Sequence, residues 1–144
     1  EKGERAACAN SIWAFMDLEK GRPVKPQPED IEKYGTEAPL EMEYAPRKIR
    51  LPQKLEEGSA FPVRKYHIDT NEHVNNCQYV QMALEALREE MLVRQVRVEY
   101  KRSAVLGDMI CPRTAREEER TVVELCSAEG KPYAVVELTG EKRC

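Results

Sequence analysis

An eight-residue segment, Asp69-Thr70-Asn71-Glu72-His73-Val74-Asn75-Asn76, combines the side chains that acid-base chemistry requires. A neutral imidazole can take a proton from water near neutral pH, and a carboxylate can orient the ring and stabilise the imidazolium. The two-residue steps from Asp69 to Asn71 to His73 would place all three side chains on one face if the backbone is extended. The segment therefore predicts an acyl-transfer site.

The roles of the three side chains differ in how far their chemistry defines them. Asp69 is the predicted orienter of His73, which is the predicted general base. Asn71 has both a donor and an acceptor, so it could hold the attacking water or polarise the substrate carbonyl, and both roles stay open. The same residue types also occur in turns before helices, where they only satisfy backbone groups. Taken alone, the Asp-x-Asn-x-His pattern favours that simpler interpretation.

An amphipathic helix is predicted directly after this segment, over about residues 75–90. Its apolar side chains recur at three- and four-residue intervals, at Val80, Ala83, Leu84, Leu87 and Met91. Asn75 or Asn76 is the predicted N-cap, and the free N–H groups of the first turn would point toward the three polar side chains. Such a helix end suits a carbonyl oxygen that becomes negative during reaction, so Asn75 and Asn76 are the predicted oxyanion site.

Five strands are predicted around this helix, over residues 60–67, 95–105, 109–115, 121–127 and 133–139. Gly107-Asp108 and the segment 129–132 are the predicted turns. No second helix of comparable amphipathicity is available to cover the first one. The sequence therefore predicts an α+β domain in which a concave sheet face buries a single helix.

The region before this domain differs from it in composition. Residues 11–18 are apolar enough for a strand, and prolines then punctuate a long connection in which residues 29–34 could form one helical turn. We predict three parts: residues 1–20, a linker over residues 21–58, and the main domain over residues 59–144.

Composition excludes several classes of protein. The chain has 144 residues and a formal net charge of −3, which argues against a nucleic-acid partner. No apolar run approaches the roughly 20 residues that span a bilayer, so no membrane span is expected. Five cysteines at irregular spacing contain no metal-ligand pair and suit free thiols in a reducing, cytoplasmic compartment. We expect no metal and no cofactor. Cys77 could be nucleophilic in the first helical turn, but buried apolar packing is the preferred interpretation.

Two blocks of sequence together resemble one protein family. The first is Asp69-Thr70-Asn71-Glu72-His73-Val74-Asn75-Asn76-Cys77-Gln78-Tyr79, and the second is the segment Val96–Asp108. Both are similar to the acyl-acyl carrier protein (acyl-ACP) thioesterases of fatty-acid synthesis. The resemblance implies a hot-dog fold, a curved antiparallel sheet wrapped around a central helix. It also implies that Asp69, Asn71 and His73 are catalytic, and that residues 1–20 end a preceding, mostly absent hot-dog unit.

One departure from this family concerns the residues after Arg102. Plant members have a Glu-Cys pair with assigned catalytic roles where this chain has Ser103-Ala104. Because Ala104 has no thiol, direct attack by water is expected, with Ser103 as a weak hydrogen-bonding helper at most. The bacterial branch of the family is therefore the expected closer relative.

The resemblance also implies a substrate and partners. It predicts hydrolysis of fatty acyl thioesters on acyl carrier protein, and a ligand site between two hot-dog units, supplied by a homodimer or by a second unit. Basic residues near the predicted site could meet the acidic carrier, although solvated strand faces explain each of them equally simply: Arg64, Lys65, Arg94, Arg97, Lys101 and Arg102. Two alternatives stay open, a hot-dog acyl-CoA thioesterase and a non-catalytic acyl-binding or oligomerisation module.

Overall fold

The computed structural model describes residues 3–142, and its contacts divide the chain into two compact units between Ala45 and Pro46. The first unit has little regular structure. Strand β1 (Met16–Asp17) pairs antiparallel with β2 (Arg22–Pro23), and α1 (Pro28–Glu32) follows. The single helical turn expected in this region is therefore confirmed.

The strand predicted over residues 11–18 is formed only at β1. Residues 11–14 have no strand partner in the described part of the chain, and a strand needs a neighbour to bond its backbone groups. Their apolar side chains are correspondingly open to solvent. Trp13 is 83% exposed and Leu18 at the turn is 93% exposed.

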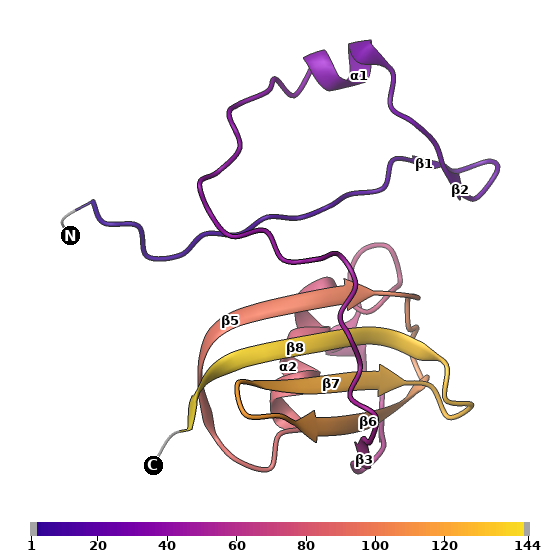
Figure 1. Cartoon of the computed structure of the whole chain (residues 1–144). Coiled ribbons are helices and arrows are strands. Elements are labelled where there is room, and N and C mark those ends of the chain that lie inside the picture. The colour runs from indigo at the N-terminus through magenta and orange to yellow at the C-terminus, as the bar shows by residue number, and fades with distance from the viewer. Residues whose placement is uncertain (1–2, 143–144) are drawn as a thin grey trace. The chain divides into compact units, whose positions relative to one another are not determined.

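The second unit contains one antiparallel sheet and one long helix, labelled in Figure 1. The sheet order is β3-β6-β7-β8-β5, with β4 pairing β6 outside this path. The elements are β3 (Glu56–Glu57), β4 (Phe61–Pro62), the 3-10 turn η1 (Lys65–His67), α2 (Asn76–Glu85), β5 (Met91–Tyr100), β6 (Met109–Arg116), β7 (Arg120–Cys126) and β8 (Pro132–Lys142). This is the predicted α+β arrangement. No helix in residues 3–142 is both long enough and apolar enough to cross a membrane.

Helix α2 packs on the inner face of the sheet, chiefly against β7 and β8 (Figure 1). Its buried side chains are Tyr79, Met82 and Ala83, which lie on one side of the helix. They meet every second residue of the two central strands, which is the alternation that a sheet with one face in the core requires. The strand residues of this core are Val123, Leu125, Ala134, Val136 and Leu138.

Two predicted elements end earlier in the structure than expected. The helix ends at Glu85 rather than about residue 90, because two acidic residues at 89–90 would lie beside the negative end of the helix dipole and Met91 already starts β5. The strand predicted over 95–105 is β5, which ends at Tyr100. The N–H groups of Lys101 and Arg102 both donate to the carbonyl of Tyr133, which ends the ladder there.

The strand predicted over residues 60–67 is also mostly absent. Only β4 pairs with the sheet, and the chain then turns through η1. The reason is local, because the backbone N–H of Arg64 donates to Nδ1 of His67 at 2.9 Å and folds the chain back on itself.

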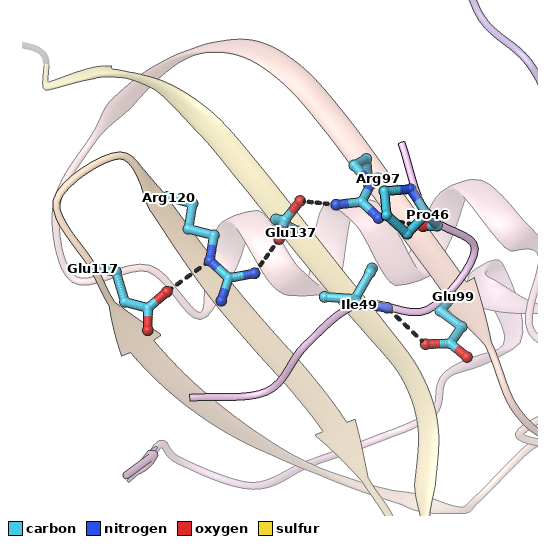
Figure 2. Close-up of polar contacts among 7 residues, drawn as sticks. All are labelled: Pro46, Ile49, Arg97, Glu99, Glu117, Arg120 and Glu137. Atoms are coloured by element: carbon cyan, nitrogen blue, oxygen red, sulfur yellow. Dashed lines mark hydrogen bonds and ion pairs between the residues drawn. The ribbon is translucent and has the colours of Figure 1, made fainter. Parts of the chain in front are cut away.

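The outer face of the sheet is covered by an extended segment, residues 46–53, which we call the strap. Ile49 of the strap is buried in a small cluster with Val122 and Val135. Its N–H donates to Oε2 of Glu99 at 3.1 Å, and the carbonyl of Pro46 accepts from Nη2 of Arg97 at 2.5 Å (Figure 2). The first strap residues therefore bind to the sheet through both backbone and apolar contacts.

A buried carboxylate lies beside the strap. Glu137 is 5% exposed, and Figure 2 shows its side chain between the guanidinium groups of Arg97 and Arg120. Oε1 accepts from Arg97 at 2.5 Å and Oε2 accepts from Arg120, which also binds Glu117 at 2.6 Å. Two bound cations offset the cost of keeping this carboxylate out of water.

Candidate functional site

The segment from Asp69 to His73 forms a closed turn between Ile68 and Val74, which pair as an antiparallel bridge. The N–H of Asp69 donates to the carbonyl of His73 at 2.9 Å, and the N–H of Glu72 donates to the carbonyl of Asp69 at 3.1 Å. Glu72 has a φ of 62°, a left-handed conformation that turns the chain. The predicted extended backbone is therefore wrong, and strand alternation does not align the three side chains.

The carboxylate of Asp69 serves this turn. Its Oδ1 accepts from the N–H of Asn71 at 2.8 Å, an Asx turn. Within residues 3–142, no hydrogen bond joins Asp69 to the ring of His73, and Asn71 and His73 are both exposed. The structure thus holds the three residues within one small loop, but it shows Asp69 fixing the backbone rather than the imidazole.

Helix α2 begins beside this loop, with Asn75 as its N-cap as predicted. Oδ1 of Asn75 accepts from the N–H of Cys77 at 3.0 Å, and the carbonyl of Asn75 accepts from the N–H of Gln78 at 2.9 Å. The N–H of Asn76 has no partner within the described residues. It is therefore the first-turn donor that remains available to a ligand oxygen.

A backbone carbonyl and a tyrosine hydroxyl hold this helix end in place. The carbonyl of His67 accepts from the N–H of Asn75 at 2.8 Å, and the hydroxyl of Tyr100 donates to the carbonyl of Asn76 at 3.0 Å. His67 is 7% exposed. Because Nδ1 accepts from Arg64, the neutral ring carries its proton on Nε2. Burial lowers the pKa of His67, which favours this neutral form.

Ser103 and Ala104 lie next to the candidate loop because Ala104 is bonded to Val74 at the end of the loop and to Tyr79 of helix α2. The carbonyl of Ala104 accepts from the N–H of Val74 at 2.9 Å, and its N–H donates to the hydroxyl oxygen of Tyr79 at 2.8 Å. Tyr79 and Ala104 are buried, and burial raises the pKa of Tyr79. Exposed Ser103 is therefore adjacent to the loop, as the helper role requires.

The segment after Ala104 is fixed by a second tyrosine. Oδ2 of Asp108 accepts from the hydroxyl of Tyr133 at 2.9 Å and from the N–H of Val105 at 3.0 Å. Burial, followed by the Asp108 carboxylate, raises the pKa of Tyr133 to about 12. From the sequence, Asp108 was predicted only as a turn residue, and no pattern indicated that Tyr133 would bind it. Both tyrosines position the backbone around the candidate site.

Two further predictions need correction. Cys77 is exposed, so it is not the buried apolar filler that was expected, because the N-cap directs the first turn of α2 toward solvent. Three of the basic residues predicted to meet the carrier protein are instead paired with carboxylates. Arg97 is bound to Glu137 at 2.5 Å and Lys101 to Glu99 at 2.5 Å, while Arg94 lies 3.3 Å from Glu141.

Arg64 and Lys65 are exposed on η1, next to the candidate loop, and make no ion pair within the described residues. Arg102 lies over the ring of Tyr133, with 4.4 Å between its guanidinium carbon and the ring centroid. Three of the six predicted basic residues therefore keep their charge free of a carboxylate partner within the described residues, namely Arg64, Lys65 and Arg102.

Two pockets of the domain lie away from the candidate loop. One, of about 350 Å³, is lined by residues near the other end of α2, including Leu87, Met91 and Thr121. The other lies between the strap and the sheet, at Gln53 and Arg120. Within residues 3–142, no group of three or more His, Cys, Asp or Glu side chains could hold a metal ion.

Comparison with known proteins identifies the family. Residues 51–138 match the family model for the acyl-ACP thioesterase C-terminal domain. The chain belongs to this family. It is 32% identical over 113 residues to a chloroplastic palmitoyl-acyl carrier protein thioesterase of Cuphea hookeriana, a match that covers 69% of this chain and 26% of that protein. A chloroplastic acyl-acyl carrier protein hydrolase of Cuphea viscosissima is 30% identical over 137 residues, covering 85% of this chain and 30% of that protein.

Solved acyl-ACP thioesterase structures share the fold of this family member. The thioesterase of Bacteroides thetaiotaomicron superposes with a TM-score of 0.68 at 16% identity, covering 88% of this chain and 53% of that one. The 12:0-ACP thioesterase of Umbellularia californica superposes with a TM-score of 0.67 at 18% identity, covering 89% and 53%. The predicted hot-dog fold is confirmed.

This family member spans less than a third of the length of the curated relatives described above. Those relatives are plant proteins, and both plant and bacterial structures share the fold. The expected placement in the bacterial branch stays a prediction.

Proposed function

We propose that this chain supplies the catalytic loop of an acyl-ACP thioesterase, which hydrolyses the fatty acyl thioester of acyl carrier protein to a free fatty acid. The observation that carries the proposal is the arrangement at the start of α2. A loop containing Asp69, Asn71 and His73 is closed by its own backbone bonds, directly beside the unused N–H of Asn76. Family membership supports the reaction class.

The chemistry assigns one step to each group. His73 takes a proton from water, and the hydroxide equivalent attacks the thioester carbonyl carbon. The oxygen that becomes negative accepts from the N–H of Asn76 at the positive end of α2. Collapse of the tetrahedral intermediate breaks the carbon–sulfur bond, and the proton held by His73 passes to the departing thiolate. Ala104 supplies no nucleophile, which favours direct attack by water.

Asp69 takes a different role in this proposal from the one its spacing suggested. Its Oδ1 holds the N–H of Asn71 and so fixes the loop that carries His73. This turn also sets the orientation of the Asn71 side chain, which in this proposal binds either the attacking water or the substrate carbonyl. Asp69 is therefore a positioning residue in this proposal. To orient the His73 imidazole as well, its carboxylate would have to move to the ring when substrate binds.

We also propose that a second hot-dog unit, from another copy of the chain or from a preceding unit, completes the site. Strand β5 pairs only with β8 among the described strands, so its other edge is open. Apolar side chains are exposed along it, with Val96 at 41% and Tyr100 at 45%. An open apolar edge is suited to pairing with another strand. A dilute sample that sediments as a monomer would contradict the homodimer.

The test of the reaction compares acyl-ACP with acyl-CoA substrates, using the unaltered chain, His73→Ala and Asn71→Ala. Removal of the general base should lower kcat by roughly 10² to 10⁴. His67→Gln, at the domain's other histidine, is the matched control for loss of an imidazole and should retain most of the activity. Faster turnover of acyl-CoA would favour the alternative substrate. Binding of acyl chains without turnover, unchanged by His73→Ala, would favour a non-catalytic module.

Asp69→Asn separates the two roles of Asp69. An amide oxygen can still accept from the N–H of Asn71, so a positioning role predicts a loss of less than about 10-fold, whereas removal of a charge that stabilises the imidazolium predicts a larger loss in kcat with unchanged KM. Circular dichroism of each variant confirms that the domain is folded.

A further inference from the structure

Two cysteines lie opposite each other on neighbouring strands of the sheet. Cys111 of β6 and Cys126 of β7 are direct partners in the antiparallel register. Directly opposite residues project their side chains from the same face of a sheet. Among the described residues, Cys111 and Cys126 are free thiols, and neither has a role in the proposed hydrolysis.

The backbone geometry places this pair within reach of a disulfide. The carbonyl of Pro112 accepts from the N–H of Gly58 at 2.8 Å, so the polar groups of Pro112 face away from β7. Because these groups alternate along a strand, those of Cys111 face β7, which makes the pair with Cys126 a hydrogen-bonded one. The Cα atoms of such a pair are about 5.5 Å apart, and disulfides span roughly 4.4 to 6.8 Å.

The two thiols have different surroundings. Cys126 is completely buried, whereas Cys111 is partly exposed. Burial, followed by the nearby carboxylate of Glu124, raises the pKa of Cys126 to about 11. The carboxylate of Glu124 lies near the Cys126 thiol and is 3.6 Å from the guanidinium of Arg113, its partner on β6. A solvent oxidant can therefore reach Cys111 first, while Cys126 has a carboxylate in place to receive its proton.

We propose that Cys111 and Cys126 form an oxidation site, which hydrogen peroxide converts to a disulfide between β6 and β7. In the first step the sulfur of Cys111 attacks the peroxide O–O bond, giving a sulfenic acid and one molecule of water. In the second step the sulfur of Cys126 displaces the sulfenic hydroxyl as the S–S bond forms, and the thiol proton passes by way of Glu124 to the departing hydroxyl, which leaves as a second water. Two electrons pass from the dithiol to the peroxide.

The product would be a reversible modification. Disulfides in reducing compartments are transient, and a thiol such as glutathione would restore the two cysteines. Because Cys111 is partly exposed, such a reductant could reach its sulfur in the disulfide. Simple packing of two small apolar side chains predicts instead that peroxide leaves both thiols unchanged.

The experiment uses the full chain carrying Cys8→Ser, Cys77→Ser and Cys144→Ser, which leaves only Cys111 and Cys126. The folded protein is treated with hydrogen peroxide, and free thiols are counted after unfolding in denaturant. We expect loss of both thiols without cross-linking between chains, full recovery on reduction, and a linked Cys111–Cys126 peptide in mass spectrometry. The same peptide is sought in the unaltered chain, so poor folding of the triple variant does not remove the test.

Single variants assign the order of the two steps. In the same background, Cys126→Ser should leave a sulfenic acid at Cys111 that dimedone traps, and Cys111→Ser should protect Cys126. Two intact thiols after peroxide treatment, cross-links only between chains, or equal oxidation of Cys126 in Cys111→Ser would each overturn the proposal.

Discussion

The hydroxyl of Tyr79 offers the sharpest test of how the candidate site is held together. This oxygen accepts the N–H of Ala104 at 2.8 Å, and Tyr79 and Ala104 are 2% and 0% exposed. Tyr79→Phe keeps the ring and removes only the acceptor. The N–H of Ala104 then stays buried without a partner, because no water can reach it where it lies.

The expected loss follows from that single unpaired group. A buried donor left without an acceptor costs about 1 to 3 kcal/mol. Little is lost in packing, since the ring of Phe fills the same space and still contacts Tyr100, whose centroid is 5.8 Å away. For a domain of this size, 1 kcal/mol corresponds to roughly 4 to 8 °C in Tm. We therefore expect Tm to fall by at least about 4 °C.

Urea unfolding followed by circular dichroism measures the free energy of unfolding, and amide exchange reports on the N–H of Ala104. Tyr66→Phe is the matched control. Tyr66 is 76% exposed in the same domain, and its hydroxyl has no partner within the described residues, so a change within about 0.5 kcal/mol is expected. If Tyr79→Phe destabilises the domain no more than Tyr66→Phe, the hydrogen bond does not hold the Ala104 segment.

Two further predictions concern charged groups. Glu137→Gln should lower the free energy of unfolding by roughly 3 kcal/mol, because it leaves the guanidinium groups of Arg97 and Arg120 beside a neutral, 5% exposed side chain. Glu141→Gln, whose exposed ion pair with Arg94 is solvated, should change it by less than about 0.5 kcal/mol in the same urea titration, and equal losses would contradict this view. Burial lowers the pKa of His67 below its ordinary value of 6.5, so below that pH the unfolded chain binds more protons than the folded one. The stability that neutral His67 contributes should be complete above pH 6.5 and lost as the pH falls through the lower, folded-state pKa. His67→Gln should flatten this part of the pH profile, and an unchanged slope would show that other groups cause it.

Much of the fold could be predicted because the central strands have simple patterns. The segments β6 and β7 agree with their predicted ranges within one residue, since each lies between clear turn signals. Helix α2 was located correctly, but its end was not, because Leu87 and Met91 continue the apolar spacing and pack against the core although the helix ends at Glu85. Periodicity indicates which side chains face the core, not where the helical backbone ends.

The candidate site was predictable in position more than in geometry. The N-cap was narrowed to Asn75 or Asn76 from residue type alone, and the structure has Asn75. The turn at Asp69 was not, because alternation assumes an extended backbone, and a short polar side chain can instead bond its own backbone two residues on. The roles of Tyr79 and Tyr133 depend on contacts with residues about 25 positions away, which no local pattern reveals.

The strap has a practical consequence for anyone who trims this chain. Cutting at Leu51, where the family match starts, would strip Ile49 from Val122 and Val135 and take away one acceptor of Arg97. The side chains of Val122 and Val135 would then form an exposed apolar patch near Arg97 and Arg120, and exposed apolar patches promote aggregation. A fragment intended for expression should therefore begin at or before Pro46.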